Sequence, residues 1–281
     1  MLERGNDRWL SWFDHGPRDG KPVFFLHGIP GSRVAPAGLA TEASALGLRL
    51  ISPDRPGYGD STPTRHYGLA DHTSDLLALA DHLELERFSV LGFSGGGVFA
   101  LACAQEAASR MDNLVVVGMP AIPLMEDPFA HGGELSAGTW RLGRDNPETL
   151  PGQLEPLLTS AESLCDAMHQ AMSANDTALL SQEPLRSAYL DEIKAATVQG
   201  PRIAALSFAR DIALMAKDWP FKAGQIKRKV HVVHGLHDNL VFPEHARCLA
   251  SHLPDCELSL LGTAGHYTAL TAPETLRLLT E

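Results

Sequence analysis

The stretch SVLGFSGGGVFALACA, residues 89–104, places Ser94 where an apolar run ends and a run of small, helix-favouring residues begins. Glycine surrounds this serine at positions 92, 95, 96 and 97. A serine on a sharp strand-to-helix turn has a strained backbone, and side chains at 92 and 96 would collide across the turn. The pattern Gly-x-Ser-x-Gly between a strand and a helix therefore indicates an exposed nucleophile.

The backbone around Ser94 suits the same chemistry. In such a turn the N–H of Gly95 faces the oxygen on which negative charge develops, and the following helix adds its positive end. This short motif also arises by chance. A lone serine is a poor nucleophile that needs a base, and the base needs an orienting acid, so the rest of the chain decides the interpretation.

Continuous apolar runs elsewhere in the chain predict a mostly parallel sheet. Continuous rather than alternating runs are typical of strands buried on both faces. The runs are 22–28, 48–59, 88–97, 113–120 and 229–235, with helical patterns at 71–86, 96–111 and 242–254. Alternation of strand and helix predicts an α/β protein with a doubly wound sheet.

The alternation stops between residues 121 and 220. This segment carries helical patterns at 161–172, 185–197 and 201–219 but no strand pattern. We expect residues 1–120 and 221–281 to form the α/β core, and residues 121–220 to form a helical cap over the carboxyl edge of the sheet. Such folds bind their ligands at that edge. The Pro- and Gly-rich segment 119–133 is the expected entry to the cap.

A base and an acid follow later strands in a suitable order. Asp238 lies three residues beyond a predicted strand that ends at Gly235, and His266 follows the run 258–265. Serine, then acid, then histidine is the order expected for a nucleophile on this type of turn. The segment after the first core strand offers the N–H of Ile29 as a second oxyanion donor. We expect His27 to brace that loop.

Five segments resemble the landmarks of the α/β-hydrolase superfamily in order and spacing. They are LHGIPGSR (26–33), DRPGYGDS (54–61), VLGFSGGG (90–97), VVHGLHDNLVFP (232–243) and GTAGHYT (262–268). The resemblance extends from about residue 7 to the C-terminus. It implies that Ser94 is the nucleophile, that His266 is the general base and then acid, and that Asp238 orients it. Ile29 and Gly95 would be the oxyanion-hole donors.

The N-terminal region departs from the superfamily pattern. Members usually begin with an additional strand, whereas residues 8–14 here look like the second one. We expect the first strand to be missing or very short. That would leave a sheet edge open to pairing, which would permit a homodimer. Only 15 residues follow His266, so the final helix should be short as well.

Several other residues compete for functional roles. Glu126 is the fallback for the acid, while Asp54 and Asp60 are expected to form turns. The histidines at 231, 234 and 237 with Asp238 suggest a metal cluster at first sight, but residues 231 and 234 point to opposite faces of a strand, so we expect no metal site. Three aromatic residues either line the pocket or pack beside it. They are Tyr58, Phe93 and Tyr267.

The leading functional expectation is a serine hydrolase that cleaves a small carboxylic ester or related acyl compound through an acyl-enzyme, with no cofactor. Dehalogenases and epoxide hydrolases of the superfamily carry aspartate in place of Ser94. Four alternatives remain. They are a C–C bond hydrolase, a cofactor-free perhydrolase, a peptidase similar to proline iminopeptidases, and a ligand receptor without catalysis. Proline iminopeptidases usually have His-Gly-Gly-Pro-Gly in the segment that corresponds to residues 27–31, whereas position 29 is isoleucine here.

The resemblance implies a small-molecule acyl substrate as the partner, and the charge balance argues against other classes of partner. The chain of 281 residues has 23 basic and 34 acidic residues and a formal net charge of −11, which argues against binding nucleic acid or an anionic membrane. No signal-peptide pattern and no membrane-spanning run are apparent, so we expect a cytoplasmic protein. The four cysteines form no Cys-x-x-Cys pair and are expected to be reduced.

Overall fold

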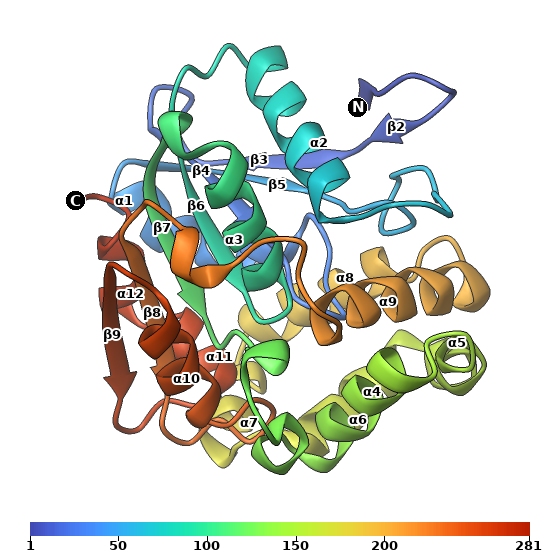
Figure 1. Ribbon diagram of the computed structural model, residues 1–281. Coiled ribbons are helices and arrows are strands. Elements are labelled where there is room, and N and C mark those ends of the chain that lie inside the picture. The colour runs from blue at the N-terminus through green and yellow to red at the C-terminus, as the bar shows by residue number, and fades with distance from the viewer.

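The computed structural model describes residues 1–281 and contains a seven-stranded sheet of order β3-β5-β4-β6-β7-β8-β9 (Figure 1). All neighbouring pairs are parallel except β3 with β5. The strands are β3 (Trp12–His15), β4 (Lys21–Leu26), β5 (Leu48–Pro53), β6 (Phe88–Phe93), β7 (Met111–Val117), β8 (Val230–Gly235) and β9 (Cys256–Leu261). The expected α/β-hydrolase architecture with a mostly parallel sheet is confirmed.

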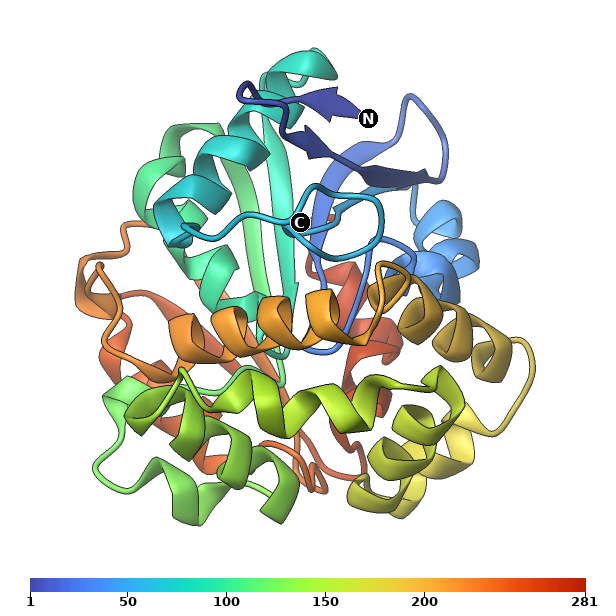
Figure 2. The same cartoon turned by 90° about the vertical axis from the view of Figure 1, so that its right-hand side faces the viewer.

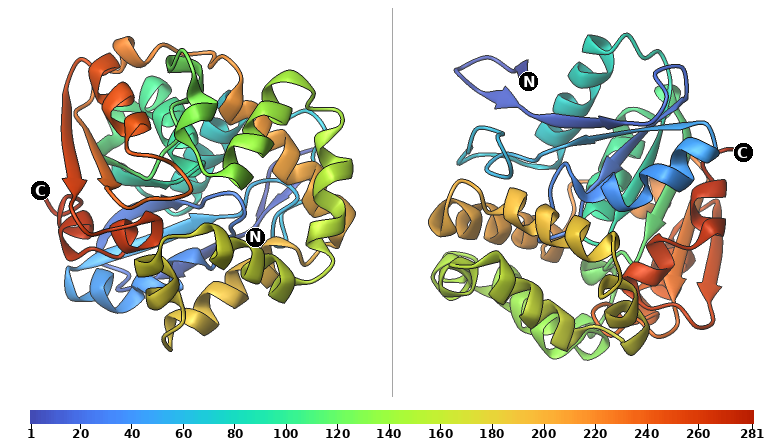
Figure 3. Two further views of the ribbon diagram at one scale, coloured as in Figure 1. Left: turned by 90° about the horizontal axis from the view of Figure 1, so that it is seen from below. Right: turned by 180° about the vertical axis from the view of Figure 1, so that it is seen from behind.

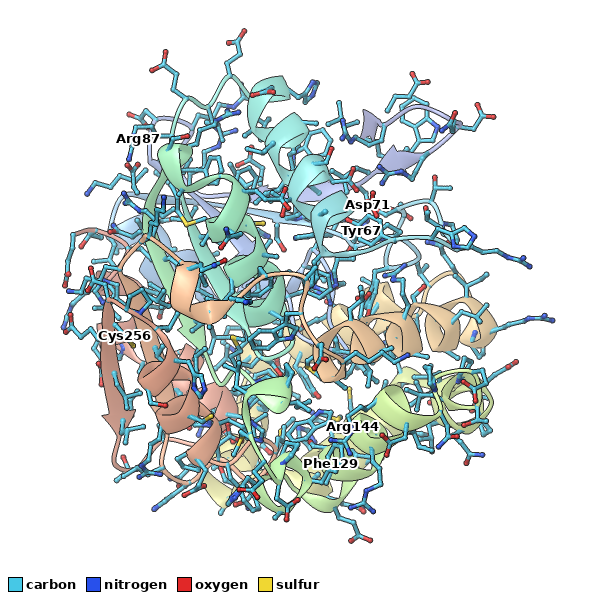
Figure 4. All side chains as sticks on the ribbon, viewed as in Figure 1. Tyr67, Asp71, Arg87, Phe129, Arg144 and Cys256 are labelled. Atoms are coloured by element: carbon cyan, nitrogen blue, oxygen red, sulfur yellow. The ribbon has the colours of Figure 1, made fainter.

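Burial explains the apolar runs of the central strands. Every residue of β6 and β8 is buried, as expected for strands covered on both faces. The edge strand β9 is half-buried along most of its length. Cys256 begins β9 at this outer edge, as Figure 4 shows, and none of the four cysteines is in a disulfide.

Helices cover both faces of the sheet. α2 and α3 pack together on the face turned to the viewer in Figure 1, while α1 and α12 pack together on the other face, seen in the right panel of Figure 3. The helices of this core are α1 (Ala40–Ala45), α2 (Leu69–His82), α3 (Gly96–Glu106), α10 (Glu244–His252), α11 (His266–Leu270) and α12 (Pro273–Arg277). Short 3₁₀ turns occur at Ala35–Leu39, Ala108–Arg110 and Ala223–Gln225.

Residues 121–220 are helical and contribute no strand to the sheet. We call α4 to α9, together with their connections, the inserted helices. They are α4 (Glu134–Asp145), α5 (Leu150–Leu154), α6 (Ala161–Ala171), α7 (Ala174–Leu180), α8 (Leu185–Ala196) and α9 (Pro201–Ala216), with 3₁₀ turns at Ile122–Leu124, Pro128–His131 and Glu155–Leu158. Figure 2 shows α4 and α9 side by side across the end of the sheet. One continuous apolar core joins these helices to the sheet.

The sequence patterns did not predict α4. Its Gly138 and Gly143 weaken the helical signal, since glycine is among the poorest helix formers. Gly143 serves packing instead, because a Cβ there would lie 2.6 Å from Ile212 Cγ2 on α9. In the last turn of α4, the Arg144 guanidinium carbon lies 4.2 Å from the ring centroid of Phe129 in the preceding 3₁₀ turn. Both side chains are labelled in Figure 4, and their contact fixes that turn against the helix.

The expected strand at 8–14 divides in two at Ser11. Its first part, β2 (Trp9–Leu10), pairs with β1 (Leu2–Glu3) as a separate hairpin, and only β3 joins the main sheet. Ser11 interrupts the strand because its N–H donates to Ser61 Oγ and its carbonyl accepts from the N–H of Asp54. A first strand within the main sheet is therefore absent, and β3 forms the edge. No helix has the length and apolar character required to cross a membrane.

Candidate active site

Six neighbouring strands bring their following residues to one edge of the sheet. The loop after β4 carries Gly28 and Ile29, the turn after β6 carries Ser94, and the segments after β8 and β9 carry Asp238 and His266. Carboxyl ends of parallel strands meet at the same edge, which is where such sheets bind ligands. The inserted helices cover this edge, and the enclosed space is the candidate active site.

Ser94 occupies the strained turn expected from its glycines. Its φ is +53°, a conformation rare for any residue with a side chain, and its N–H donates to Val117 O at 2.8 Å. A Cβ on Gly92 would lie 2.7 Å from Gly97 Cα, directly across the turn. A Cβ on Gly96 would instead strike the Leu26 carbonyl of the neighbouring strand. Glycine at 96 thus permits contact between α3 and β4 rather than closure of the turn.

His266 and Asp238 form a buried pair. His266 Nδ1 lies 2.6 Å from Asp238 Oδ2, and both side chains are almost completely buried. A carboxylate only accepts, so Nδ1 carries the proton and Nε2 is left free to act as a base. His266 lines the same cavity as Ser94. The ring of Phe93 packs against the imidazole with centroids 4.8 Å apart and restricts its rotation.

Asp238 is itself held in place by its own loop. Its Oδ1 accepts the N–H groups of Leu240 and Val241, each at 2.9 Å, and His234 Nε2 lies 3.3 Å from Oδ2. Burial alone would raise the pKa of Asp238, but the His266 charge and the hydrogen bonds from both histidines hold it well below its usual range. Glu126, the alternative acid, is exposed and has no contact with His266.

A second carboxylate holds the backbone of His266. Asp176 on α7 is fully buried, and its Oδ2 accepts the N–H of His266 at 2.7 Å. Its Oδ1 accepts the N–H of Thr268 at 2.8 Å and the Thr268 hydroxyl at 3.0 Å. Gly265 is required for this approach, since a Cβ there would lie 2.2 Å from Asp176 Oδ2. An inserted helix thus fixes the start of α11.

The two carboxylates determine the protonation of His266. Burial alone would lower the pKa of His266, because it disfavours the charged imidazolium. The charge and hydrogen bond of Asp238, together with the charge of Asp176, outweigh burial and raise the pKa of His266 above its ordinary value of 6.5. The site therefore stabilises the imidazolium that a general base becomes when it takes a proton.

Two backbone N–H groups beside Ser94 are free to bind an oxyanion. The N–H groups of Ile29 and Gly95 donate to no other group of the protein. Both residues line the cavity with Ser94, and the Ile29 side chain lies against Gly95, where a Cβ would be 2.8 Å from Ile29 Cδ1. Unpaired N–H groups at the start of α3 also have the positive end of the helix behind them.

The cavity measures about 110 Å³ and its wall is mostly apolar. Core residues form its floor, and inserted helices α4, α6 and α9 form its roof. The residues with polar side chains that line it are Ser94, Ser136, Thr139, Trp140, His266 and Tyr267. No aspartate, glutamate, lysine or arginine lines it. Leu135 and Leu157 line it too and are 37% and 46% exposed, so they mark its mouth.

Phe93 and Tyr267 line the cavity, whereas Tyr58 does not. Of the two alternatives left open for Tyr58, the structure therefore shows packing beside the pocket. Its ring is fully buried and stacks on Phe208 with centroids 5.1 Å apart, so it supports a cavity residue from behind. A bulky side chain that follows Gly57, which has φ +82°, turns into the core rather than toward the cavity.

The other side chains considered from the sequence lie outside the cavity. Asp54 is fully buried and accepts the N–H of Arg33 at 2.7 Å, while the exposed Asp60 pairs with the Arg33 guanidinium at 2.6 Å. His231 lies 3.6 Å from Glu257, and His234 Nε2 donates to Val241 O at 2.8 Å. His27 Nδ1 donates to Gly28 O at 2.9 Å and so braces its loop.

A family model described as alpha/beta hydrolase fold matches residues 21–273. The chain belongs to the α/β-hydrolase fold family. Its curated relatives include a proline iminopeptidase and a 2-hydroxymuconate semialdehyde hydrolase. A proline iminopeptidase of Arabidopsis thaliana is 32% identical over 175 residues, which cover 59% of this chain but only 43% of that protein. The chain thus spans less than half the length of this relative.

A longer match joins the chain to a 2-hydroxymuconate semialdehyde hydrolase of Pseudomonas putida. The two are 25% identical over 273 residues, or 95% of this chain and 88% of the relative. Among solved structures, an enol-lactonase from Burkholderia xenovorans aligns with a TM-score of 0.70 and 22% identity over 98% of both chains. That likeness supports the fold alone.

Sequence reasoning missed three residues that hold the site. Asp176 and Asp211 lie inside helices of the inserted segment, and no local motif marks them. Arg55 stands within the segment DRPGYGDS, two residues beyond the end of strand β5. The sequence signal that could have identified Arg55 is the presence of an arginine just after a strand, at the edge of the sheet where ligands bind.

Proposed function

We propose that this protein is a serine hydrolase that cleaves a small, uncharged carboxylic ester or related acyl compound through an acyl-enzyme. The observation that carries the proposal is the absence of Asp, Glu, Lys and Arg from the cavity that contains Ser94 and His266. Burying an ionised group without a partner is costly, so such a cavity favours a neutral substrate.

In the proposed reaction, Ser94 Oγ attacks the carbonyl carbon while His266 Nε2 takes its proton. The N–H groups of Ile29 and Gly95 hold the oxyanion of the tetrahedral intermediate. His266 then gives the proton to the leaving alcohol as the C–O bond breaks. Water, deprotonated by His266, attacks the acyl-enzyme and releases the acid. Asp238 keeps Nδ1 protonated and stabilises the imidazolium in both halves of the reaction.

The same observation argues against two alternative substrates. An aminopeptidase must bind a substrate ammonium group, and a hydrolase of a muconate semialdehyde must bind a carboxylate. The cavity offers no opposite charge to either. Asp176 and Asp211 are already occupied by donors of the protein. Glu192 lines a separate cavity, and burial raises its pKa to about 8.

Cavity size sets the expected acyl group. An engineered apolar cavity of roughly 150 Å³ holds one benzene molecule. The cavity here, at about 110 Å³, is somewhat smaller. It should therefore accept an acyl chain of about four carbons in place of solvent. Longer chains would have to project through the mouth between Leu135 and Leu157.

The test compares 4-nitrophenyl esters that differ in one property at a time. We expect turnover to peak near the butanoate, and the succinate half-ester, which adds a carboxylate, to react on the order of 10²-fold more slowly. Ser94→Ala should abolish turnover and labelling by a fluorophosphonate, whereas Ser251→Ala on the surface of α10 should change neither. Faster cleavage of proline 4-nitroanilide or of the succinate would refute the neutral-substrate assignment. Equal rates in Ser94→Ala and the native protein would refute the serine mechanism.

A further inference from the structure

The Arg55 side chain lies beneath the loop that carries Ile29. It is fully buried, and each of its three nitrogens donates a hydrogen bond. Nη1 donates to His27 O at 2.7 Å, Nη2 to Gly28 O at 2.8 Å, and Nε to Asp211 Oδ2 at 2.6 Å. One guanidinium therefore joins the loop after β4 to the inserted helix α9, on which Asp211 lies.

The bond to Gly28 O fixes the direction of the next N–H. The carbonyl of Gly28 and the N–H of Ile29 belong to one planar trans peptide, so they point in opposite directions. Arg55 draws the carbonyl inward, away from the cavity. The N–H of Ile29, which has no acceptor in the protein, is thereby turned toward the cavity side, where Ser94 lies.

We propose that Arg55, oriented by Asp211, is a positioning residue that aims the Ile29 N–H at the oxyanion. This inference rests on the proposed function, because it concerns the transition state of the serine reaction. It assigns to an inserted helix a part in the chemistry as well as in covering the cavity.

The surroundings of Arg55 leave its guanidinium one orientation. Its central carbon lies 4.6 Å from the ring centroid of Phe99 and 5.0 Å from that of Tyr58, so aromatic rings hold the plane. Asp211 is held from its other oxygen by Arg210, whose Nε donates to Oδ1 at 2.8 Å. A planar fork that is fixed in this way can align a peptide group, whereas a flexible ammonium cannot.

His27 supports the same carbonyl. Its Nδ1 donates to Gly28 O at 2.9 Å, so this oxygen accepts from two side chains. Burial, and then the charge of Arg55, keep the pKa of His27 well below 6.5, and the imidazole is neutral at pH 7. His27 supplies a hydrogen bond without charge, and Arg55 supplies a charged one.

Stability alone does not account for this ion pair. Buried pairs are often replaced by apolar residues with no loss of stability, because burial costs both charges their hydration. Two Arg55 nitrogens bind the carbonyls of His27 and Gly28, the two residues directly before the oxyanion donor Ile29. This arrangement is expected of a group that orients a backbone.

The first variant is Arg55→Lys, which keeps the charge but cannot reach both carbonyls and Asp211 at once. Removing an oxyanion donor lowers kcat on the order of 10²- to 10³-fold, and misaligning one should lower it about 10- to 100-fold. KM should stay within about twofold, because the ground-state carbonyl depends less on this donor.

Two ligands separate positioning from general damage. Butylboronic acid forms a tetrahedral adduct with Ser94 that places an oxygen near the Ile29 N–H, whereas butanamide binds as an uncharged ground-state analogue. In Arg55→Lys the affinity for the boronic acid should fall by the same factor as kcat/KM, and the affinity for butanamide should not change. A purely structural role would weaken both ligands together.

A double variant, Arg55→Met with Asp211→Leu, removes both charges of the pair. Arg210 loses its bond to Asp211 but keeps its bond to Pro56 O at 2.9 Å. Its melting temperature shows whether it folds, and we expect the same selective loss of boronic acid affinity. The matched control is Arg8→Met with Asp75→Leu, which removes another ion pair with a 2.6 Å contact, between the N-terminal hairpin and α2. This control should leave both affinities unchanged.

The outcomes are distinguishable. If the native protein shows Ser94-dependent turnover and binds the boronic acid, but folded Arg55 variants retain both within twofold, the role of Arg55 is overturned and the proposed function stands. If the native protein shows neither, both are overturned, since there is no oxyanion to position. If the double variant does not fold, Arg55→Lys decides by itself.

Discussion

Replacing Asp176 should release the start of α11 and disturb His266 without touching its side chain. Asp176→Ala removes the acceptor of the N–H groups of His266 and Thr268 and of the Thr268 hydroxyl. Each buried donor left unpaired costs about 1–3 kcal/mol, so the loss for three donors is at least about 3 kcal/mol. That is a large part of the roughly 5–15 kcal/mol that stabilises a typical domain.

The rate should respond as well, and in a direction that identifies the cause. The charge of Asp176 contributes to the raised pKa of His266. Without it, the acid limb of kcat/KM should move to lower pH, while kcat falls because the imidazole is no longer held in register with Ser94. The pH dependence of kcat and kcat/KM measures the effect on the rate. A urea titration followed by circular dichroism measures the effect on stability independently.

Ser173→Ala is the matched control for Asp176→Ala. Ser173 caps α7 and donates to Asp176 Oδ2 at 2.9 Å, but it makes no bond to His266. Losing a helix cap costs typically about 1 kcal/mol and should leave the pH profile in place. The reasoning is refuted if Asp176→Ala unfolds at the native urea midpoint, or if Ser173→Ala reproduces its full effect.

Three further predictions concern the native protein and one glycine. Because the pKa of His266 is raised, kcat/KM should be half-maximal above pH 6.5 and fall as the pH drops below it, since the protonated ring cannot take the serine proton; a flat profile down to pH 5 would contradict this. The pKa values of His72 and His245 are lowered to about 3 by burial, so the unfolded chain binds more protons below pH 6.5. The free energy of unfolding should then decline on acidification by up to about 1.4 kcal/mol per pH unit for each histidine, and urea midpoints at pH 7, 6 and 5 would show no such decline if these rings were charged in the folded state. Gly96→Ala places a Cβ against the Leu26 carbonyl and should destabilise the protein by about 3 kcal/mol, whereas Gly138→Ala in α4 meets open space and should be neutral or stabilising; equal melting temperatures for the two variants would contradict the packing argument.

The sequence was most informative where a residue and its strand end are adjacent. Ser94 follows β6 directly, Asp238 lies three residues beyond β8, and His266 lies five beyond β9. In each case an apolar run, a glycine and a polar residue occur within one short window. Such a window predicts that its polar residue lies at the edge of the sheet, and no distant contact has to be known for this.

The remaining parts of the site depend on contacts between distant segments. Asp176 binds the backbone 90 residues away, and Asp211 binds Arg55 across 156 residues. An aspartate inside an amphipathic helix has the same local signature whether it meets solvent or a buried donor. The division of the N-terminal strand at Ser11 has a similar origin, because its partners are Ser61 and Asp54.

The two buried carboxylates make the inserted helices poor candidates for exchange between related hydrolases. A grafted segment that reproduced the apolar roof would still leave the Arg55 guanidinium without a counter-ion and the N–H of His266 without an acceptor. Substrate range in this protein should therefore be altered by replacing single roof residues such as Thr139 or Ile212, with the whole segment retained. The inserted helices that shape the cavity also supply Asp176 and Asp211. They cannot be exchanged without disturbing the groups that perform the reaction.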